Sequence, residues 1–218
     1  GIGLFRIEHM FYGKNSEEPL FALRKMILCS EKEERIAALN ELFPMMKKSI
    51  IETFTAMKGL PVTIRLMDPP LHEFVPKAAD KIAQIAESLN ISVEEVEKRA
   101  AALHESNPMM GHRGCRLGMS YPAVTAMQAR AVAEAAAKVK GSKPEIMIPL
   151  IGDIKELKFV KDIVVETAEE VKDAIKDLAA QGLTLEQLYM QHVANANYNT
   201  EAPDAIKQYE QKAKTQNA

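Results

Sequence analysis

Two arginines, each placed where an apolar run meets a turn, are the residues of this chain best suited to chemistry. Arg65 ends an apolar run and is followed by Pro69 and Pro70, and Arg113 lies in the sequence Gly111-His112-Arg113-Gly114. A guanidinium stays protonated at any working pH and offers a planar fork of N–H donors to carboxylate or phosphate oxygens. Two fixed guanidiniums at strand ends are what a small anion that carries several charges needs, although either arginine alone is more readily interpreted as part of a surface salt bridge.

The segments around these arginines alternate between short β-branched runs and helical patterns. We expect strands over residues 1–8, 62–67, 113–117 and 145–151. Their apolar runs are nearly continuous, as in strands that are covered on both faces, and the alternation is typical of βα units around a parallel sheet. Because ligands bind at the carboxyl ends of such strands, Arg65 is expected at the mouth of the sheet.

Start signals divide the helical segments. Ser30 with Glu33 and Ser92 with Glu95 have the spacing of a capping box, and Pro44 is suited to the first turn of a further helix. Further helical patterns cover residues 121–139 and the chain from residue 153 onward, where Thr184 with Gln187 forms another capping-box pattern.

The number of strands limits the architecture. A complete (β/α)₈ barrel needs about 250 residues and eight strands, whereas four strands are found by about residue 151 of this 218-residue chain. We therefore expect an α/β fold: a partial (β/α)₈ TIM barrel of about four βα units over residues 1–165, then a helical C-terminal tail over residues 166–218 that matches no family clearly.

Four segments of the chain carry a resemblance to a known family. Residues 1–11, 59–74, 107–118 and 144–150 resemble, in this order, four strand-and-loop units of the phosphoenolpyruvate (PEP)/pyruvate-binding domain of pyruvate, phosphate dikinase. The most specific parts are the loop Asp-Pro-Pro-Leu-His-Glu-Phe and the run Gly-His-Arg-Gly-Cys-Arg-Leu-Gly. PEP synthase and enzyme I of the sugar phosphotransferase system share the βα layout without these two motifs, so the dikinase is the favoured relative.

The resemblance implies roles for individual residues. Arg65 and Arg113 correspond to substrate-binding arginines, and no catalytic residue is expected in this chain. Supporting roles are expected for Arg6 and Glu8, which are equally well read as an ordinary salt bridge, and for Asp68 and His72, whose loop hydrogen bonds would orient Arg65. The carrier histidine of the family belongs to a separate domain, so His112 is not expected to be catalytic, and Cys115 is expected to be buried in a strand.

The resemblance also implies a reaction, namely phosphoryl transfer between PEP and an enzyme histidine, with Mg²⁺ bridging the substrate. Residues 166–218 contain no counterpart of the family's metal-binding acids or of its proton-donor cysteine. We therefore expect no metal ligand here, and a fragment of a dikinase that is inactive by itself. The alternatives are a non-catalytic half-barrel that binds a small anion or a protein partner, and a segment of a related PEP-utilising enzyme.

Bulk properties exclude some classes of partner and suggest others. A net charge of −2 gives no electrostatic footprint for nucleic acid, and no apolar run reaches the roughly 20 residues of a membrane span. The two cysteines form no CxxC pair, which favours reduced thiols in the cytoplasm. The chain begins at Gly1 without a signal peptide pattern and reads as part of a longer protein. A half-barrel would leave open sheet edges and expose Val62, Ile64 and Ile148, or the opposite register, so self-association is expected.

Overall fold

A small parallel sheet organises the computed structural model, which describes residues 1–13, 16–105 and 107–180. The strands are β1 (Ile2–Arg6), β2 (Pro61–Arg65) and β3 (Lys143–Met147), in the order β1-β2-β3. Both pairings are parallel, so the three carboxyl ends lie at the same edge of the sheet. This combination of helices with a parallel sheet confirms the expected α/β class.

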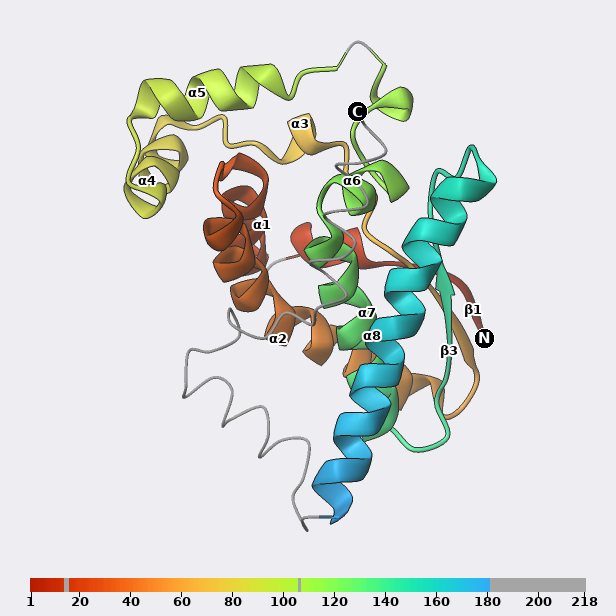
Figure 1. The fold of residues 1–218 in the computed structure, drawn as a ribbon. Helices are drawn as coiled ribbons and strands as arrows, with labels where there is room; N and C mark the ends of the chain where they lie inside the picture. Colours follow the sequence, from red (N-terminus) through yellow and green to blue (C-terminus); the bar gives the residue numbers. More distant parts are fainter. Residues whose placement is uncertain (14–15, 106, 181–218) are drawn as a thin grey trace.

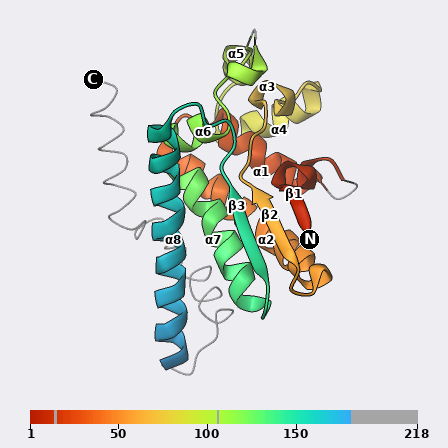
Figure 2. The same ribbon diagram turned by 90° about the vertical axis from the view of Figure 1, so that its right-hand side faces the viewer.

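Long helices cover one face of this sheet. Helices α1 (Glu17–Leu28) and α2 (Lys32–Met57) connect β1 to β2, α7 (Pro122–Lys138) leads into β3, and α8 (Ile154–Ala180) follows it. In Figure 2 strands β2 and β3 lie in front of α2 and α7, whereas α8 runs alongside the strands and packs against α7. Figure 1 shows the same helices beside the sheet. No described helix is both long and apolar enough to cross a membrane.

The main core lies between the helices and the covered face of the sheet. Val62 and Ile64 of β2 are fully buried there, together with Leu42 and Ile50 of α2 and Ala131 of α7. Alternate residues of β2 point to this core, as the period-two geometry of a strand requires.

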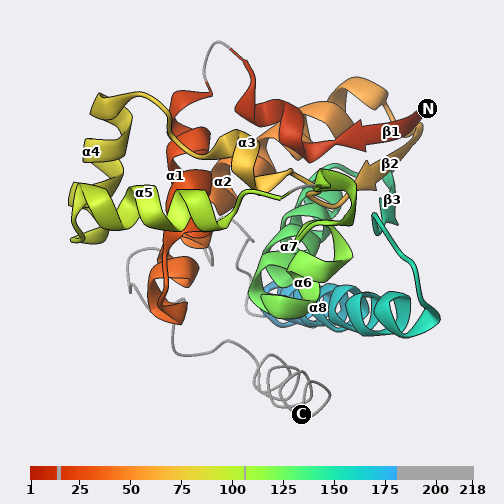
Figure 3. The same ribbon diagram turned by 90° about the horizontal axis from the view of Figure 1, so that it is seen from above.

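Shorter helices extend the molecule beyond the carboxyl ends of the strands. After β2 the chain forms α3 (Leu71–Phe74), α4 (Ala79–Leu89) and α5 (Val93–Ala102), and α4 and α5 lie far from the sheet in Figure 3. Two 3₁₀ helices (Ile7–Phe11 and Pro108–Met110) and the short α6 (Cys115–Ser120) lie nearer the strand ends. A second apolar cluster, with Leu28, Ile85 and Val96, joins α1 to α4 and α5.

The third predicted strand is wrong. Residues 115–120 form helix α6, and Gly114 before it has a φ of +58°, a left-handed conformation that turns the chain out of any strand. The sheet therefore has three described strands rather than four, and the four βα units expected from the sequence are not what these residues form. Cys115 is buried, as predicted, but at the first position of a helix.

Two helix boundaries also differ from the prediction. Helix α2 runs through Pro44 without a break, and its N-cap is Glu31, with no side-chain capping bond from Ser30. Phe43 and Met46 on either side of the proline are buried, so tertiary packing holds the helix together where propensity would break it. The predicted helix start at Ser92 is confirmed, since its hydroxyl accepts a hydrogen bond from the backbone N–H of Glu95, while the Glu95 carboxylate pairs with Arg99.

The exposed face of the sheet does not carry Val62 and Ile64, the two β2 residues that were predicted to be exposed. Val62 and Ile64 face the helices, so the opposite register is exposed, with Thr63 of β2 donating a 2.6 Å hydrogen bond to Glu145 of β3. Helix α8 continues through residues 165 and 166 without interruption. The division of the chain at that point stays a prediction, and the capping box at residues 184–187 lies outside the described residues.

Candidate functional site

The ends of the three strands bring charged residues into register. Arg65, the last residue of β2, is the Cα partner of Arg6 on β1 and of Met147 on β3. Glu8 lies two residues after the end of β1, and Asp68 lies three residues after the end of β2. The parallel pairing thus gathers at one edge residues that are far apart in the sequence.

Two arginines and two carboxylates form one network at this edge. Arg113 Nε donates to Asp68 Oδ1 at 2.6 Å, and Arg113 Nη2 donates to the backbone carbonyl of Asp68 at 2.6 Å. Arg65 Nη2 donates to Glu8 Oε1 at 3.3 Å, and Arg65 Nη1 lies 3.7 Å from Asp68 Oδ2. Glu8 Oε1 also accepts from the backbone N–H of Asp68. The guanidiniums of Arg65 and Arg113 therefore converge on one buried acid.

The other residues expected to support Arg65 lie differently. Arg6 is exposed and forms no ion pair within the described part of the chain, while Glu8 pairs with Arg65 rather than with Arg6. His72 lies on α3, with its ring 5.9 Å from that of His104, and has no hydrogen bond to either arginine among the described residues. The structure thus groups Glu8 and Asp68 with the arginine pair and leaves His72 outside it.

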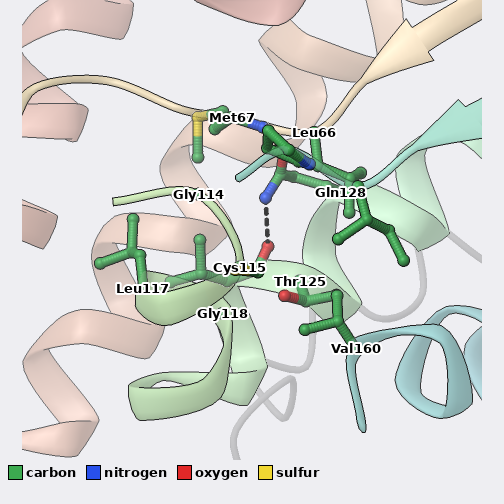
Figure 4. A pocket seen from close by; sticks show the side chains of 12 residues that line it. Leu66, Met67, Gly114, Cys115, Leu117, Gly118, Thr125, Gln128 and Val160 are labelled. Atoms are coloured by element: carbon green, nitrogen blue, oxygen red, sulfur yellow. Dashed lines mark hydrogen bonds between the residues drawn. The ribbon is translucent and has the colours of Figure 1, made fainter. Parts of the chain in front are cut away.

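A buried glutamine beneath the network holds the chain that leaves β2. Gln128 of α7 accepts a 2.5 Å hydrogen bond from the backbone N–H of Met67 and donates to the carbonyl of Val124. Together with Gly114, Cys115 and others it lines a cavity of about 10 Å³, close to the size of one water molecule (Figure 4). Gln128 was not among the residues predicted for the site, although an amide on the buried stripe of an alanine-rich helix is a signal that could have identified it.

His112, next to Arg113, lies in a stack that the sequence did not predict. Its ring is 5.7 Å from that of Tyr121, edge-on, and the guanidinium of Arg35 lies 3.8 Å from the centre of the Tyr121 ring. Burial lowers the pKa of His112 below the usual 6.5, while Glu105 acts in the opposite direction. A neutral, enclosed imidazole fits a structural role beside Arg113.

Cys115 shows no sign of nucleophilic activation. Its thiol is buried and donates to the carbonyl of Leu150 at 3.2 Å. Burial, and after it the charge of Glu156, raises the pKa of the Cys115 thiol. Since the thiolate is the nucleophile, this environment favours the inert form.

The residues of this site do not fit the Mg²⁺ that the resemblance implies. Mg²⁺ prefers six oxygen ligands in near-octahedral geometry, but Glu8 and Asp68 already bind guanidiniums, whose positive charge repels a cation. The residues that the structure describes contain no group of three or more His, Cys, Asp or Glu side chains that could hold a metal ion. No step of the chemistry is therefore assigned to a metal held by these residues.

Comparisons with known proteins match the chain over most of its length. The family model of the PEP-binding domain of PEP-utilising enzymes matches residues 1–196. Pyruvate, phosphate dikinase from Clostridium symbiosum is 51% identical over 177 residues, which cover 79% of this chain and 20% of that protein.

Two further dikinases show the same pattern. The enzyme from Rhizobium meliloti (strain 1021) is 48% identical over 78% of this chain and 19% of its own length, and the chloroplastic pyruvate, phosphate dikinase 1 from Arabidopsis thaliana is 48% identical over 78% of this chain and 18% of its own length. The chain spans about a fifth of the length of these curated relatives. Because this family model covers most of the chain, the chain belongs to the PEP-utilising enzymes, in their PEP-binding domain.

Proposed function

We propose that this chain is a fragment of a pyruvate, phosphate dikinase and binds PEP or pyruvate through Arg65 and Arg113. The observation that carries the proposal is the convergence of both guanidiniums at the carboxyl edge of the parallel sheet. Parallel α/β folds place their ligands at this edge. The names of the relatives, all pyruvate, phosphate dikinases, supply the reaction class.

In this proposal the arginines position the substrate and balance its charge. Phosphoryl transfer depends mainly on alignment and on cations around the phosphoryl oxygens. The N–H groups of Arg65 and Arg113 would bind phosphoryl or carboxylate oxygens while the phosphoryl group passes between PEP and a histidine elsewhere in the enzyme. Mg²⁺ and ATP belong to the same proposal, with the metal held outside this site.

The proposal also covers the fold, the division of the chain and the location of the protein. The three strands form the opening part of a (β/α)₈ barrel, which covers residues 1–165 and is followed by a helical tail over residues 166–218. The proposed location is the cytoplasm. The alternative is a non-catalytic half-barrel that binds a small anion or a protein partner. It predicts no turnover when the other domains of the full-length relatives are supplied.

Titration calorimetry with PEP tests the site. The wild-type chain is expected to bind at about millimolar strength, equivalent to ~4 kcal/mol. Arg65→Lys and Arg113→Lys are each expected to weaken binding, because a point charge replaces the planar fork of donors. Arg99→Lys, which alters an arginine paired with Glu95 on α5, is the matched control. Equal affinity in the wild type and both site variants would eliminate this site.

A further inference from the structure

The carboxylate of Asp68 occupies the place between the two arginines where an anion would bind. Its Oδ1 lies 2.6 Å from Arg113 Nε and its Oδ2 lies 3.7 Å from Arg65 Nη1. The Asp68 side chain is only 4% exposed, and Glu8 Oε1 fixes its backbone N–H. An acid of the protein therefore already engages donors that a ligand would need.

Hydrogen bonds other than those of the Asp68 carboxylate also hold the segment around Arg113 in place. Arg113 Nη2 bonds to the backbone carbonyl of residue 68, which every substitution retains. The chain after Arg113 is tied independently to the loop after β3, because the N–H of Cys115 donates to Pro149 at 3.2 Å and its thiol donates to Leu150 at 3.2 Å. We therefore expect this segment to stay attached when residue 68 carries no negative charge.

The network is electrically balanced before any ligand binds. The positive charges of Arg65 and Arg113 face the negative charges of Glu8 and Asp68, and the arginine side chains are only 15% and 17% exposed. In such a poorly solvated place like charges repel strongly. An incoming anion meets the Asp68 carboxylate at close range and must draw a guanidinium away from it.

We propose that Asp68 is an internal counter-anion, which keeps the arginine pair neutralised in the free protein and is displaced from Arg113 when an anion binds. The inference rests on the proposed function and deepens it, because it assigns to the same site an autoinhibitory contact. The affinity of the site for small anions is then lower than two free guanidiniums would give.

Asp68→Asn tests the proposal because it removes the charge but retains the size and a carbonyl oxygen that can accept from Arg113. Inorganic phosphate and PEP are titrated into the full chain by calorimetry. The variant is expected to bind phosphate about tenfold more tightly than the wild type, since one nearby negative charge is gone. Asp80→Asn, a loss of the same charge on α4, is the control and is expected to leave phosphate affinity unchanged. Unchanged or weaker phosphate binding by a folded Asp68→Asn protein overturns the proposal.

Nuclear magnetic resonance of the arginine Nε–H groups gives a second readout that does not depend on the variant. In the wild type, saturating phosphate is expected to shift the Arg113 Nε resonance as its bond to Asp68 opens. A resonance that stays unchanged while phosphate binds overturns the proposal, even if Asp68→Asn fails to fold.

The two proposals fail in different ways. Arg65-dependent PEP binding together with an unchanged phosphate affinity in Asp68→Asn overturns the counter-anion and leaves the proposed function standing. Absence of PEP binding in the wild type, with tighter phosphate binding in the variant, overturns the proposed function alone. Failure of both anions to bind either protein overturns both.

Discussion

At the scale of single residues, His112 links the stability of the protein to pH. Burial lowers the pKa of His112 below 6.5, so at mildly acidic pH the unfolded chain binds a proton there more readily than the folded chain. The free energy of unfolding therefore decreases as pH falls below about 6.5, the ordinary value for histidine, toward the lower pKa of the folded state. The charged groups near the ring are Glu105, which favours protonation, and Arg35, which opposes it.

Thermal melts between pH 5.5 and 7.5 are expected to show this dependence. His112→Gln, which cannot titrate, should lose part of the decrease in melting temperature that the wild type shows toward pH 5.5. His104→Gln changes an exposed histidine and serves as the matched control. Parallel melting curves for the wild type and His112→Gln across this range would contradict the prediction.

Some residues of the site could be predicted from the sequence and others could not. Arg65 and Arg113 could be singled out because the two motifs that contain them resemble motifs of one family, whereas either motif alone is compatible with a surface salt bridge. The bridging position of Asp68 could not, because it depends on a distance to Arg113, 45 residues away along the chain. The partners of His112 and Gln128 are likewise set by tertiary packing, which no local pattern encodes.

At the scale of helices and strands, Ser92 provides the clearest capping contact. Its hydroxyl accepts a hydrogen bond from the backbone N–H of Glu95, with an N–O distance of 3.2 Å. The bond satisfies one of the backbone donors that have no partner within the first turn of α5. Ser92→Ala is expected to lower the free energy of unfolding by about 1 kcal/mol. Urea denaturation measures the change.

Ser30 supplies the matched control for this prediction. It has the same capping-box spacing in the sequence, but the helix begins after Glu31 without a side-chain bond. Ser30→Ala is therefore expected to change stability by less than about 0.5 kcal/mol, the usual range for an exposed site without such a contact. If both variants lose the same free energy of unfolding, the hydrogen bond at Ser92 does not contribute the expected stability.

The elements were predictable where local signals agree with packing. Three of the four predicted strands overlap observed strands, although each observed strand ends before its predicted end, and the alanine-rich helix α7 occurs where the pattern indicates it. The strand predicted over residues 113–117 was wrong because a short apolar run does not distinguish a strand from a helical turn. Pro44 was predicted to begin a new helix, but the buried residues around it keep α2 continuous.

At the scale of the whole molecule, the sheet leaves one face without a helical cover among the described residues (Figure 2). Leu4 of β1 is 42% exposed and Met147 of β3 is 44% exposed. Strands β1 and β3 also each have one neighbour only, so their outer edges carry backbone groups without a strand partner in the described sheet. Such edges favour pairing between chains unless something covers them.

Self-association is the expected consequence and stays a prediction. Analytical ultracentrifugation should show an average mass that rises with protein concentration, because two copies can pair their open edges and cover exposed side chains. Leu4→Lys places a charge on the edge strand and is expected to weaken association at least about tenfold, since charged edges resist pairing. Val165→Lys changes an equally exposed apolar residue, 47% exposed on α8, and should leave association unchanged. A strict monomer with a sharp two-state melt would refute the prediction, because the open sheet would then be stable without a partner.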